Sequence, residues 1–524
     1  MDWHEGYVSD IDYLAEFFPE QSPTLLSFAC ILNGIEPVPL DRPFTYFELG
    51  SGQGFTANIL AAANPQGDFY AADFNPAHVA ASCELAQAAE LENMHFLESS
   101  FADLAAGRVA LPQFDFITLH GVYTWVNADN RAHIVRFMER YLKPGGVVYL
   151  SYNAMPGWTT TLPLQRLILE HVDLYPGSRH EQILQMRRLV TGLNDNQAAY
   201  FTGNASANLR NYLDAVMDGD AGWSSYIAHE YMNHGWQPLY HADVARDVAA
   251  AKLDYAGSAC LPWAFPKLYL TPQQSALLAS IPDPALRETV LDYLKNTCFR
   301  KDVYVRGARR MSAARTEQWL AKIGVALVSL RETVSLEMRF PVRQLVLDRA
   351  EYDPLLDALA EGPKTLLELA ALPALAGKGL HGVAEMVALL AETRHASVYF
   401  LSAAGLDTAP ARRMNDAVAQ NERLNGEYRV FASPLLGSGV KAPLFQRLVY
   451  QSLSAAGAGR AGSSDAGEIA AQVWQRVKEQ QQPVILGERE LHSEDEAVTE
   501  IRATVQAILQ RRQPIWRDLR ILQD

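Results

Sequence analysis

The chain has 524 residues, of which 49% are hydrophobic and 20% charged, and this balance excludes a disordered chain or a low-complexity fibre. At roughly 150 residues per domain, the length predicts about three or four domains. The chain has 60 acidic residues against 45 basic ones, a net charge of −15. This charge argues against general nucleic-acid binding, because it repels phosphate backbones, and it is compatible with a cationic substrate.

The cysteines and the N-terminus bear on the cellular compartment. Cys30, Cys83, Cys260 and Cys298 form no C-x-x-C pair, which predicts neither a zinc cage nor a disulfide framework and favours a reducing setting. The first residues lack the basic start and apolar run of a secretory leader. No uninterrupted apolar run reaches about 18 residues, so no membrane span is expected. These features predict a cytoplasmic protein.

An α/β pattern follows a predicted N-terminal helical cap segment at 1–42. Short apolar runs alternate with helical stretches, and the runs are continuously apolar, as in strands covered by helices on both faces. This alternation predicts a doubly wound, Rossmann-like sheet. The expected strands are 44–50, 68–74, 94–99, 114–120 and 147–152, and the expected helices are 55–63, 76–89 and 127–142, the last capped by Asn127 and stopped by LKPGG.

The remaining chain divides in two. Residues about 160–235 read as a helical insertion, placed where a lid belongs, and short strands near 253–259 and at 299–307 are expected to complete the sheet. Residues 308–524 are expected to be mainly helical, and three short helices with a small strand fit a winged helix. Because residues 351–400 carry seven acids and only three Lys or Arg, we predict a protein-contact or homodimerisation module there, not a DNA reader.

The most informative segment is YFELGSGQGFTANIL. Gly50, Gly52 and Gly54 follow a strand and precede a helix, which lets the backbone turn tightly and approach a ligand. A dinucleotide site would use G-x-G-x-x-G, with a pyrophosphate on the helix N-terminus. Glu48 would repel a pyrophosphate but suits an ammonium or sulfonium group. The sequence therefore predicts a nucleoside ligand that bears positive charge.

Two further acids follow the next strands. Asp73 ends the second strand, 25 residues after Glu48, where a carboxylate can accept both ribose hydroxyls; the alternative is a helix cap ahead of Pro76. The third strand runs into residues 98–103, which would flank an adenine. Phe101 is expected to stack on the base, and Ser100 or Asp103 to meet its amino edge.

In this order, E-x-G-x-G-x-G, Asp73, the 98–103 loop and LKPGG resemble the class I S-adenosylmethionine-dependent methyltransferases. The resemblance implies S-adenosylmethionine as cofactor. It implies that Glu48, Gly50, Ser51, Gly52, Gly54, Asp73, Phe74, Ser100, Phe101 and His120 contact the cofactor, with His120 facing its methionine part or the acceptor.

Segments outside these motifs resemble one group more closely. YVSDIDYLAEFFPEQSP, HGVYTWV, SYNAMPGW, HEYMNHGWQPLY and RKDVYVRG look like bacterial methyltransferases with a methyltransferase regulatory domain, a group that includes rickettsial protein-lysine methyltransferases of outer-membrane proteins. The resemblance implies a catalytic domain over 43–307, whose regulatory part would occupy about 223–307. It also implies methyl transfer to lysines of a protein substrate. The alternatives are a small-molecule methyltransferase and a non-catalytic cofactor-binding regulator.

Candidates for catalysis and acceptor binding follow strands four and five. His120 and Tyr123 are the candidate bases by position, although a dry aromatic channel could lower a lysine pKa without one. Trp125, Tyr152, Asn153 and Trp158 are the candidate acceptor-binding residues, and core or loop roles are the alternatives for these aromatic and amide side chains. Tyr7, Asp10, Asp12 and Tyr13 are expected to close over the cofactor.

The segment HEYMNH suggests a metal site only superficially. Its second histidine comes one residue later than in H-E-x-x-H, so the two do not share a helix face. We therefore expect no metal and assign His229, His234 and His241 structural or lid roles.

Overall fold

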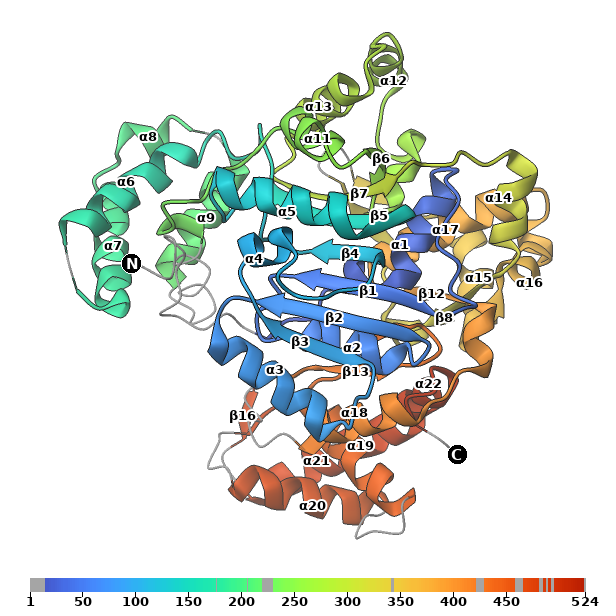
Figure 1. The fold of residues 1–524 in the computed structure, drawn as a ribbon. Coiled ribbons are helices and arrows are strands. Elements are labelled where there is room, and N and C mark those ends of the chain that lie inside the picture. Colours follow the sequence, from blue (N-terminus) through green and yellow to red (C-terminus); the bar gives the residue numbers. More distant parts are fainter. Residues whose placement is uncertain are drawn as a thin grey trace.

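The structure is a computed structural model. It describes residues 15–522 except 176, 205, 219–229, 341–343, 421–427, 458–464, 480–483, 487–488 and 492–493. Its centre is a seven-stranded sheet in the order β3-β2-β1-β4-β5-β7-β6 (Figure 1). The strands are β1 (Phe44–Leu49), β2 (Gly67–Asp73), β3 (Met94–Glu98), β4 (Phe114–Leu119), β5 (Leu142–Asn153), β6 (Leu253–Ser258) and β7 (Phe299–Arg306).

Six of the seven strands run in one direction. β1 lies between β2 and β4, with Glu48 opposite Ala71 and Thr118 in the two parallel pairings. β7 is antiparallel to both β5 and β6. The predicted doubly wound fold is confirmed, and so is the prediction that two late strands complete the sheet. Because parallel strands end at the same edge, the loops after β1 to β4 meet there.

The helices predicted at 55–63, 76–89 and 127–142 are confirmed, and a short helix that the pattern did not predict, α4, begins at Phe101 inside the expected 98–103 loop. Asn75 and Asn127 cap α3 and α5, each accepting a hydrogen bond from the backbone of the first turn. β5 is longer than expected, because the LKPGG segment after α5 already pairs with β4. These helices are α1 (Pro23–Leu32), α2 (Phe55–Ala63), α3 (Pro76–Ala88), α4 (Phe101–Ala106) and α5 (Ala128–Tyr141).

The insertion is helical throughout its described part and lies to one side of the sheet (Figure 1). It packs around its own apolar cluster, which includes Trp158, Met186 and Trp236. Its helices are α6 (Leu162–Leu174), α7 (Arg179–Asp195), α8 (Ala199–Thr202) and α9 (Ala207–Asp218); α11 (His241–Ala249), α12 (Pro272–Ala279) and α13 (Pro284–Lys295) follow. None of the described helices combines the length and apolar character that a bilayer crossing requires.

The region after β7 begins with a winged-helix-like module. Its three-stranded sheet has the order β11-β8-β12, from β8 (Ile323–Leu327), β11 (Lys364–Thr365) and β12 (Ala396–Phe400). Its helices are α14 (Ala313–Leu320), α15 (Arg349–Ala360), α16 (Leu366–Ala370) and α17 (Gly379–Glu392), and a short hairpin joins β9 (Glu337–Arg339) to β10 (Gln344–Val346). The predicted mainly helical C-terminal region is confirmed, and the winged helix stays a prediction with which these helices and short strands are compatible.

The last part of the chain covers α2 and α3 (Figure 1). There α18 contacts both helices, and the β13–β14 hairpin contacts α2. The elements are α18 (Ala409–Gln420), β13 (Val430–Ser433), β14 (Ser438–Lys441), α19 (Leu444–Gly457), α20 (Ala466–Glu479), β15 (Val484–Leu486), β16 (Arg489–Leu491), α21 (Glu494–Ala507) and α22 (Gln513–Asp518).

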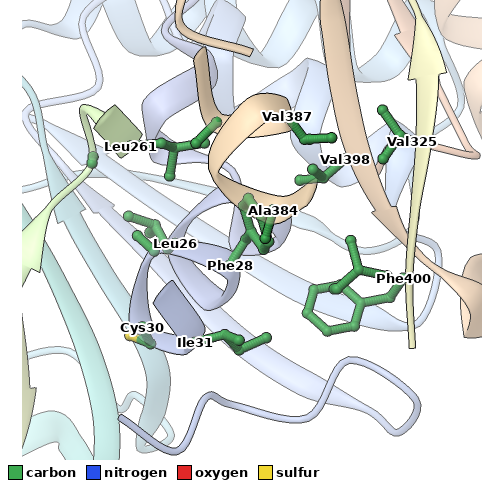
Figure 2. Close-up of a cluster of buried hydrophobic side chains, with 14 of the residues drawn as sticks. Leu26, Phe28, Cys30, Ile31, Leu261, Val325, Ala384, Val387, Val398 and Phe400 are labelled. Atoms are coloured by element: carbon green, nitrogen blue, oxygen red, sulfur yellow. The ribbon is translucent and has the colours of Figure 1, made fainter. Parts of the chain in front are cut away.

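Helix α1 lies inside the molecule. Its side chains Leu26, Phe28 and Ile31 are fully buried and pack with Leu261, α17 and the β8–β12 sheet (Figure 2). The segment expected to cap the sheet thus contributes a helix that joins the sheet to the winged-helix-like module. The chain just before α1 reaches the sheet edge where the loops meet.

Candidate functional site

A cavity of about 380 Å³ lies at the carboxyl ends of β1 to β4. A ligand is expected at this edge in a doubly wound sheet. All ten residues predicted to contact the cofactor line the cavity, as do Ala15, Glu16 and Phe18 from the segment before α1. Five lining residues are acidic and none of the described lining residues is Lys or Arg; the acids are Glu16, Glu48, Asp73, Glu98 and Asp103.

The glycine loop has the left-handed backbone that its sequence predicts. Gly50, Gly52 and Gly54 have φ of +66°, +53° and +64°. A Cβ on Gly54 would lie 2.4 Å from the Ser82 hydroxyl oxygen, so this glycine is needed for packing. A Cβ on Gly52 would meet no protein atom within 4 Å. The space beside Gly52 therefore belongs to the cavity, where a ligand can approach the backbone.

Glu48 is a buried carboxyl group at the cavity wall, only 4% exposed. Gln21 donates a hydrogen bond of 2.9 Å to Oε1, and Oε2 has no partner in the described residues. Burial raises the pKa of Glu48 to about 8, and the nearby charge of Asp73 adds to this effect. An unsatisfied buried carboxyl oxygen calls for a cationic donor, which fits the ammonium-bearing ligand expected from the sequence.

Asp73 joins the end of β2 to the glycine loop. Its Oδ2 accepts from the Gly52 amide at 2.8 Å, and its Oδ1 accepts from the Asn75 amide at 2.9 Å and lies 3.3 Å from His78 Nδ1. The helix cap is Asn75, so the alternative role as a cap does not apply to Asp73. Carboxylate oxygens have further lone pairs, which leaves Asp73 able to accept ribose hydroxyls while it holds the loop.

The residues expected around the adenine show two kinds of contact. Phe74 and Phe101 both line the cavity with apolar surface. Ser100 caps α4 by accepting from the Asp103 amide, and its hydroxyl donates to Asp103 Oδ2 at 2.9 Å. Asp103 also pairs with Arg108. Ser100 and Asp103, the two candidates to bind the amino group of the adenine, are thus hydrogen-bonded to each other at the cavity wall.

His120 lies at the end of β4 between aromatic rings. Phe18 stacks on its ring with centroids 3.8 Å apart, and the Tyr149 hydroxyl lies 2.8 Å from Nδ1. Burial lowers the pKa of His120 to about 3, and the charges of Lys301 and Arg394 contribute to the lowering. The ring is therefore neutral at physiological pH and is a weak proton acceptor. It can shape the cavity without adding a positive charge.

The second candidate base, Tyr123, is not brought to the cavity. Its side chain is fully buried in the core beside β4 and β5, and its hydroxyl donates to Asp247 at 3.2 Å. Burial raises the pKa of Tyr123 further above its ordinary value. Tyr123 therefore has the core role that was the alternative to a site role.

Among the four candidate acceptor-binding residues, only Trp125 lines the cavity. The Tyr152 hydroxyl donates to Asp302 at 2.8 Å inside the core, and the Trp158 indole donates to the Cys298 carbonyl at 2.9 Å. Tyr152 lies within β5 and Trp158 follows it, and both side chains point into the packing between elements. A position at the end of a strand does not determine whether a side chain points into the cavity or into the core.

Asn153 does not line the cavity, and it shares Glu230 as a hydrogen-bond partner with Trp125. Its amide donates to Glu230 at 2.7 Å. Burial raises the pKa of Glu230 to about 7, although hydrogen bonds from Trp236, Trp125 and Asn153 oppose the rise. Glu230 was not predicted from the sequence. It lies far from strand five along the chain, and the pairing arises only when the insertion folds back onto the sheet.

The structure adds residues from the segment before α1 that the sequence pattern did not single out. Phe18 stacks on His120 and Gln21 binds Glu48, as described above. The only sequence clue was the resemblance of the first residues to one family. Tyr7, Asp10, Asp12 and Tyr13, which were expected to close over the cofactor, lie outside the described residues.

The histidines of the HEYMNH segment lie apart in the structure. His234 is exposed and pairs with Asp173, whereas His241 is fully buried and pairs with Asp302. His229 lies outside the described residues. Within the described part of the chain, no group of three His, Cys, Asp or Glu could hold a metal ion.

The comparisons with known proteins agree with this geometry. Residues 47–148 match the family model of a methyltransferase domain, and residues 224–306 match that of a predicted methyltransferase regulatory domain. The Synechocystis protein sll1526 is 34% identical over 461 residues, which cover 86% of this chain and 88% of that protein. The Rickettsia prowazekii protein RP028 is 24% identical over 224 residues, which cover 43% of this chain and 86% of that protein.

A solved structure shows the same fold over nearly the whole chain. PKMT2 from Rickettsia typhi, solved in complex with AdoHcy, matches with a TM-score of 0.68 and 17% identity. The match covers 96% of this chain and 99% of that one. The likeness therefore includes the insertion and the C-terminal region as well as the central sheet.

The residues present fit the cofactor that the resemblance implies. Buried Glu48 offers an unpaired oxygen to a cation, and the open space at Gly52 admits a ligand next to the backbone. The described wall carries no Lys or Arg that would repel a sulfonium. The chain belongs to the S-adenosylmethionine-dependent methyltransferases that carry a methyltransferase regulatory domain.

Proposed function

We propose that this methyltransferase modifies lysine side chains of protein substrates. The observation that carries the proposal is the charge of the cavity, whose described wall has five acids and no Lys or Arg. A cationic cofactor and an acceptor that arrives as an ammonium ion both favour such a wall. S-adenosylmethionine, when bound, supplies a methyl group that is already activated for in-line displacement.

The chain's own residues then have three tasks. The loop residues Gly50 to Gly54 and Asp73 would position the cofactor, and Glu48 would balance its charge. Trp125 and Phe18 would form an aromatic wall that excludes water and holds the lysine stem. Loss of water at this aromatic wall lowers the pKa of an entering lysine and favours the neutral amine that attacks. The acids of the cavity act in the opposite direction and favour the ammonium ion that enters. Because His120 has a pKa of about 3, we assign it a shaping role and not that of the base.

Three facts support a protein acceptor. The chain shares its fold over nearly its whole length with PKMT2 of Rickettsia typhi. It also carries more than 200 residues beyond β7, a mass that a small acceptor does not require. The net charge of −15 would attract lysine-rich proteins.

The test uses methyl-labelled S-adenosylmethionine and three acceptors. One is a library of peptides with a central lysine and randomised flanks, the second has norleucine at that centre, and the third is free lysine. We expect label on the first library at the lysine amine, located by mass spectrometry, and none on the second. The variant Gly52→Val should transfer no label, because its side chain fills the space beside the loop.

The outcomes separate the alternatives. Equal labelling of free lysine and the lysine library would replace the protein substrate with a small amine. Binding of S-adenosylhomocysteine without label on any amine would refute lysine as the acceptor and favour a binding regulator.

A further inference from the structure

A second cavity of about 670 Å³ lies on the far side of β7 from the cofactor. Its walls come from β6, β7, α13 and the two short turns η2 (Leu261–Ala264) and η3 (Pro266–Leu268), near α12 and α13 in Figure 1. Its volume is in the range of sites for small organic ligands. The cavity falls within residues matched by the regulatory-domain model, apart from Asn33.

Much of the wall is aromatic or aliphatic. The rings of Trp263 and Tyr269 meet edge to face, with centroids 4.6 Å apart and an interplanar angle of 86°. Tyr255, Leu270 and Leu278 also line the cavity. A flat apolar group would find favourable contacts on such rings.

Lys295 is a cation of the wall that forms no ion pair with a described residue, although the charges of Asp292 and Glu288 act on it. The Lys295 ammonium lies 4.3 Å from the centroid of the Trp263 ring, and no carboxylate of the described residues lies within 4.0 Å of it. Burial lowers the pKa of Lys295, and the charge of Arg300 contributes to the lowering. No described residue accepts a hydrogen bond from the three N–H donors of this lysine.

The other described cations of the wall have hydrogen-bond partners: Arg287 donates to the Ile281 carbonyl at 3.1 and 2.7 Å. Arg300 forms ion pairs with Asp292, Asp302 and Glu288, and Lys301 pairs with Glu20 at 2.6 Å. Among the described cations of the wall, Lys295 alone therefore has no hydrogen-bonded partner, and it lies beside a flat apolar surface that a single carboxylate with an apolar body would fit.

We propose that this cavity binds a small monocarboxylate with a flat apolar body, the carboxylate on Lys295 and the body against Trp263. Strand β7 does not line the cofactor cavity but contacts residues that do. Phe299 lines the second cavity, and its ring lies 5.8 Å from the ring of His120. Lys301 lines it as well and holds Glu20, two residues after Phe18. A ligand that shifts β7 would therefore also move its contacts with His120 and Glu20. We expect this movement to change the affinity of the cofactor cavity for S-adenosylhomocysteine.

The experiment titrates the full chain with benzoate, hexanoate and indole-3-acetate, and with benzamide as the uncharged counterpart of benzoate. Calorimetry is run on the unmodified chain, on Lys295→Met and on the control Lys364→Met, whose lysine pairs with Glu361 elsewhere. We expect at least one carboxylate to bind the unmodified chain and the control equally, and Lys295→Met at least tenfold more weakly. The affinity of the unmodified chain for benzamide should be no higher than the affinity of Lys295→Met for benzoate.

Other results would overturn the proposal. If none of the three carboxylates binds, or if each binds Lys295→Met as tightly, the cavity is not such a site. Unchanged binding of S-adenosylhomocysteine by Lys295→Met serves as the check that the variant is folded. Coupling is measured by titrating S-adenosylhomocysteine with and without the saturating carboxylate, where we expect at least a twofold change, reciprocal in the opposite titration. No change would refute the link through β7.

Discussion

Glu48 shows how one buried residue can tie cofactor binding to pH. With a pKa of about 8, its carboxyl group is protonated at neutral pH before a ligand binds. A ligand ammonium favours the ionised form, so binding below pH 8 has to release the proton. The same group affects stability in the opposite direction. Its pKa in the unfolded chain is near 4.5, so the free energy of unfolding falls as the pH rises from there to about 8.

We therefore predict that the affinity for S-adenosylhomocysteine rises between about pH 6 and pH 8, by up to about tenfold per unit, and levels off above pH 8. Glu48→Gln should bind more weakly at pH 8 and should lose most of this dependence, because its amide does not titrate. Calorimetry across the pH range measures both. A steep profile that persists in Glu48→Gln would assign the titration to another group.

A substitution at Gly52 is expected to affect both the stability of the fold and the space for the ligand. Gly52→Ala should cost about 1–2 kcal/mol of unfolding free energy, because φ is +53°. It should also weaken S-adenosylhomocysteine binding at least tenfold, because the methyl group enters the cofactor space. Gly307→Ala is the matched control, with φ of +65° and an equally open Cβ position after β7. If both variants bind the ligand normally, the loop does not contact the cofactor.

At the scale of the elements, Arg300 joins α13 to β7. It donates to Asp292 at 2.7 and 2.8 Å and to Asp302 at 2.9 and 3.1 Å, all within the interior. Burial alone would raise the pKa of Asp302, yet Arg300, together with His241 and Tyr152, lowers it to about 2. Asp302 is therefore ionised and depends on the guanidinium, whereas burial raises the pKa of Asp292 although the charge of Arg300 opposes the rise.

Arg300→Met is expected to lower the free energy of unfolding by about 3–5 kcal/mol, because it leaves buried carboxylates uncompensated. Arg166→Met is the control: that arginine is 74% exposed and pairs with Glu170 on the surface of α6, so its loss should cost less than about 1 kcal/mol. Denaturant unfolding measures both. Equal losses would mean that the buried network contributes no more than a surface pair.

Helix α1 has a comparable role between the sheet and the winged-helix-like module (Figure 2). Phe28→Ala should lower the free energy of unfolding by about 3–5 kcal/mol, because its ring is fully buried. Leu367→Ala, on the exposed side of α16, should change it by less than about 0.5 kcal/mol. A small effect of Phe28→Ala would show that the module does not depend on α1.

Prediction from sequence succeeded where a signal is local. The strands were found because their apolar runs are continuous, and the loop around Gly52 was found because glycine spacing constrains the backbone. It failed where contacts join distant segments. No local pattern relates Gln21 to Glu48, or Asn153 to Glu230. Tyr123 and Trp125 are two residues apart with similar character, and only the folded loop decides that one enters the core and the other the cavity.

On the scale of the whole molecule, the C-terminal region packs directly on the catalytic sheet's helices. The Asn64 amide donates to the Gly437 carbonyl at 3.0 Å, and Arg413 donates to the carbonyls of Ala89 and Glu90. Apolar residues of α2, α18, β13 and α22 share one buried cluster. Two regions that share a core are expected to unfold together.

Ligand binding should therefore stabilise regions that never touch the ligand. At a free concentration about 100 times its Kd, S-adenosylhomocysteine adds about 2.7 kcal/mol to the folded state. Hydrogen exchange in mild denaturant should show this gain in α2, which borders the cofactor cavity, and equally in α18 and α22. Helix α7, packed in the separate cluster of the insertion, should gain less because it can open alone. If α18 and α22 show no gain, the C-terminal region unfolds independently and its shared core with α2 does not couple the two.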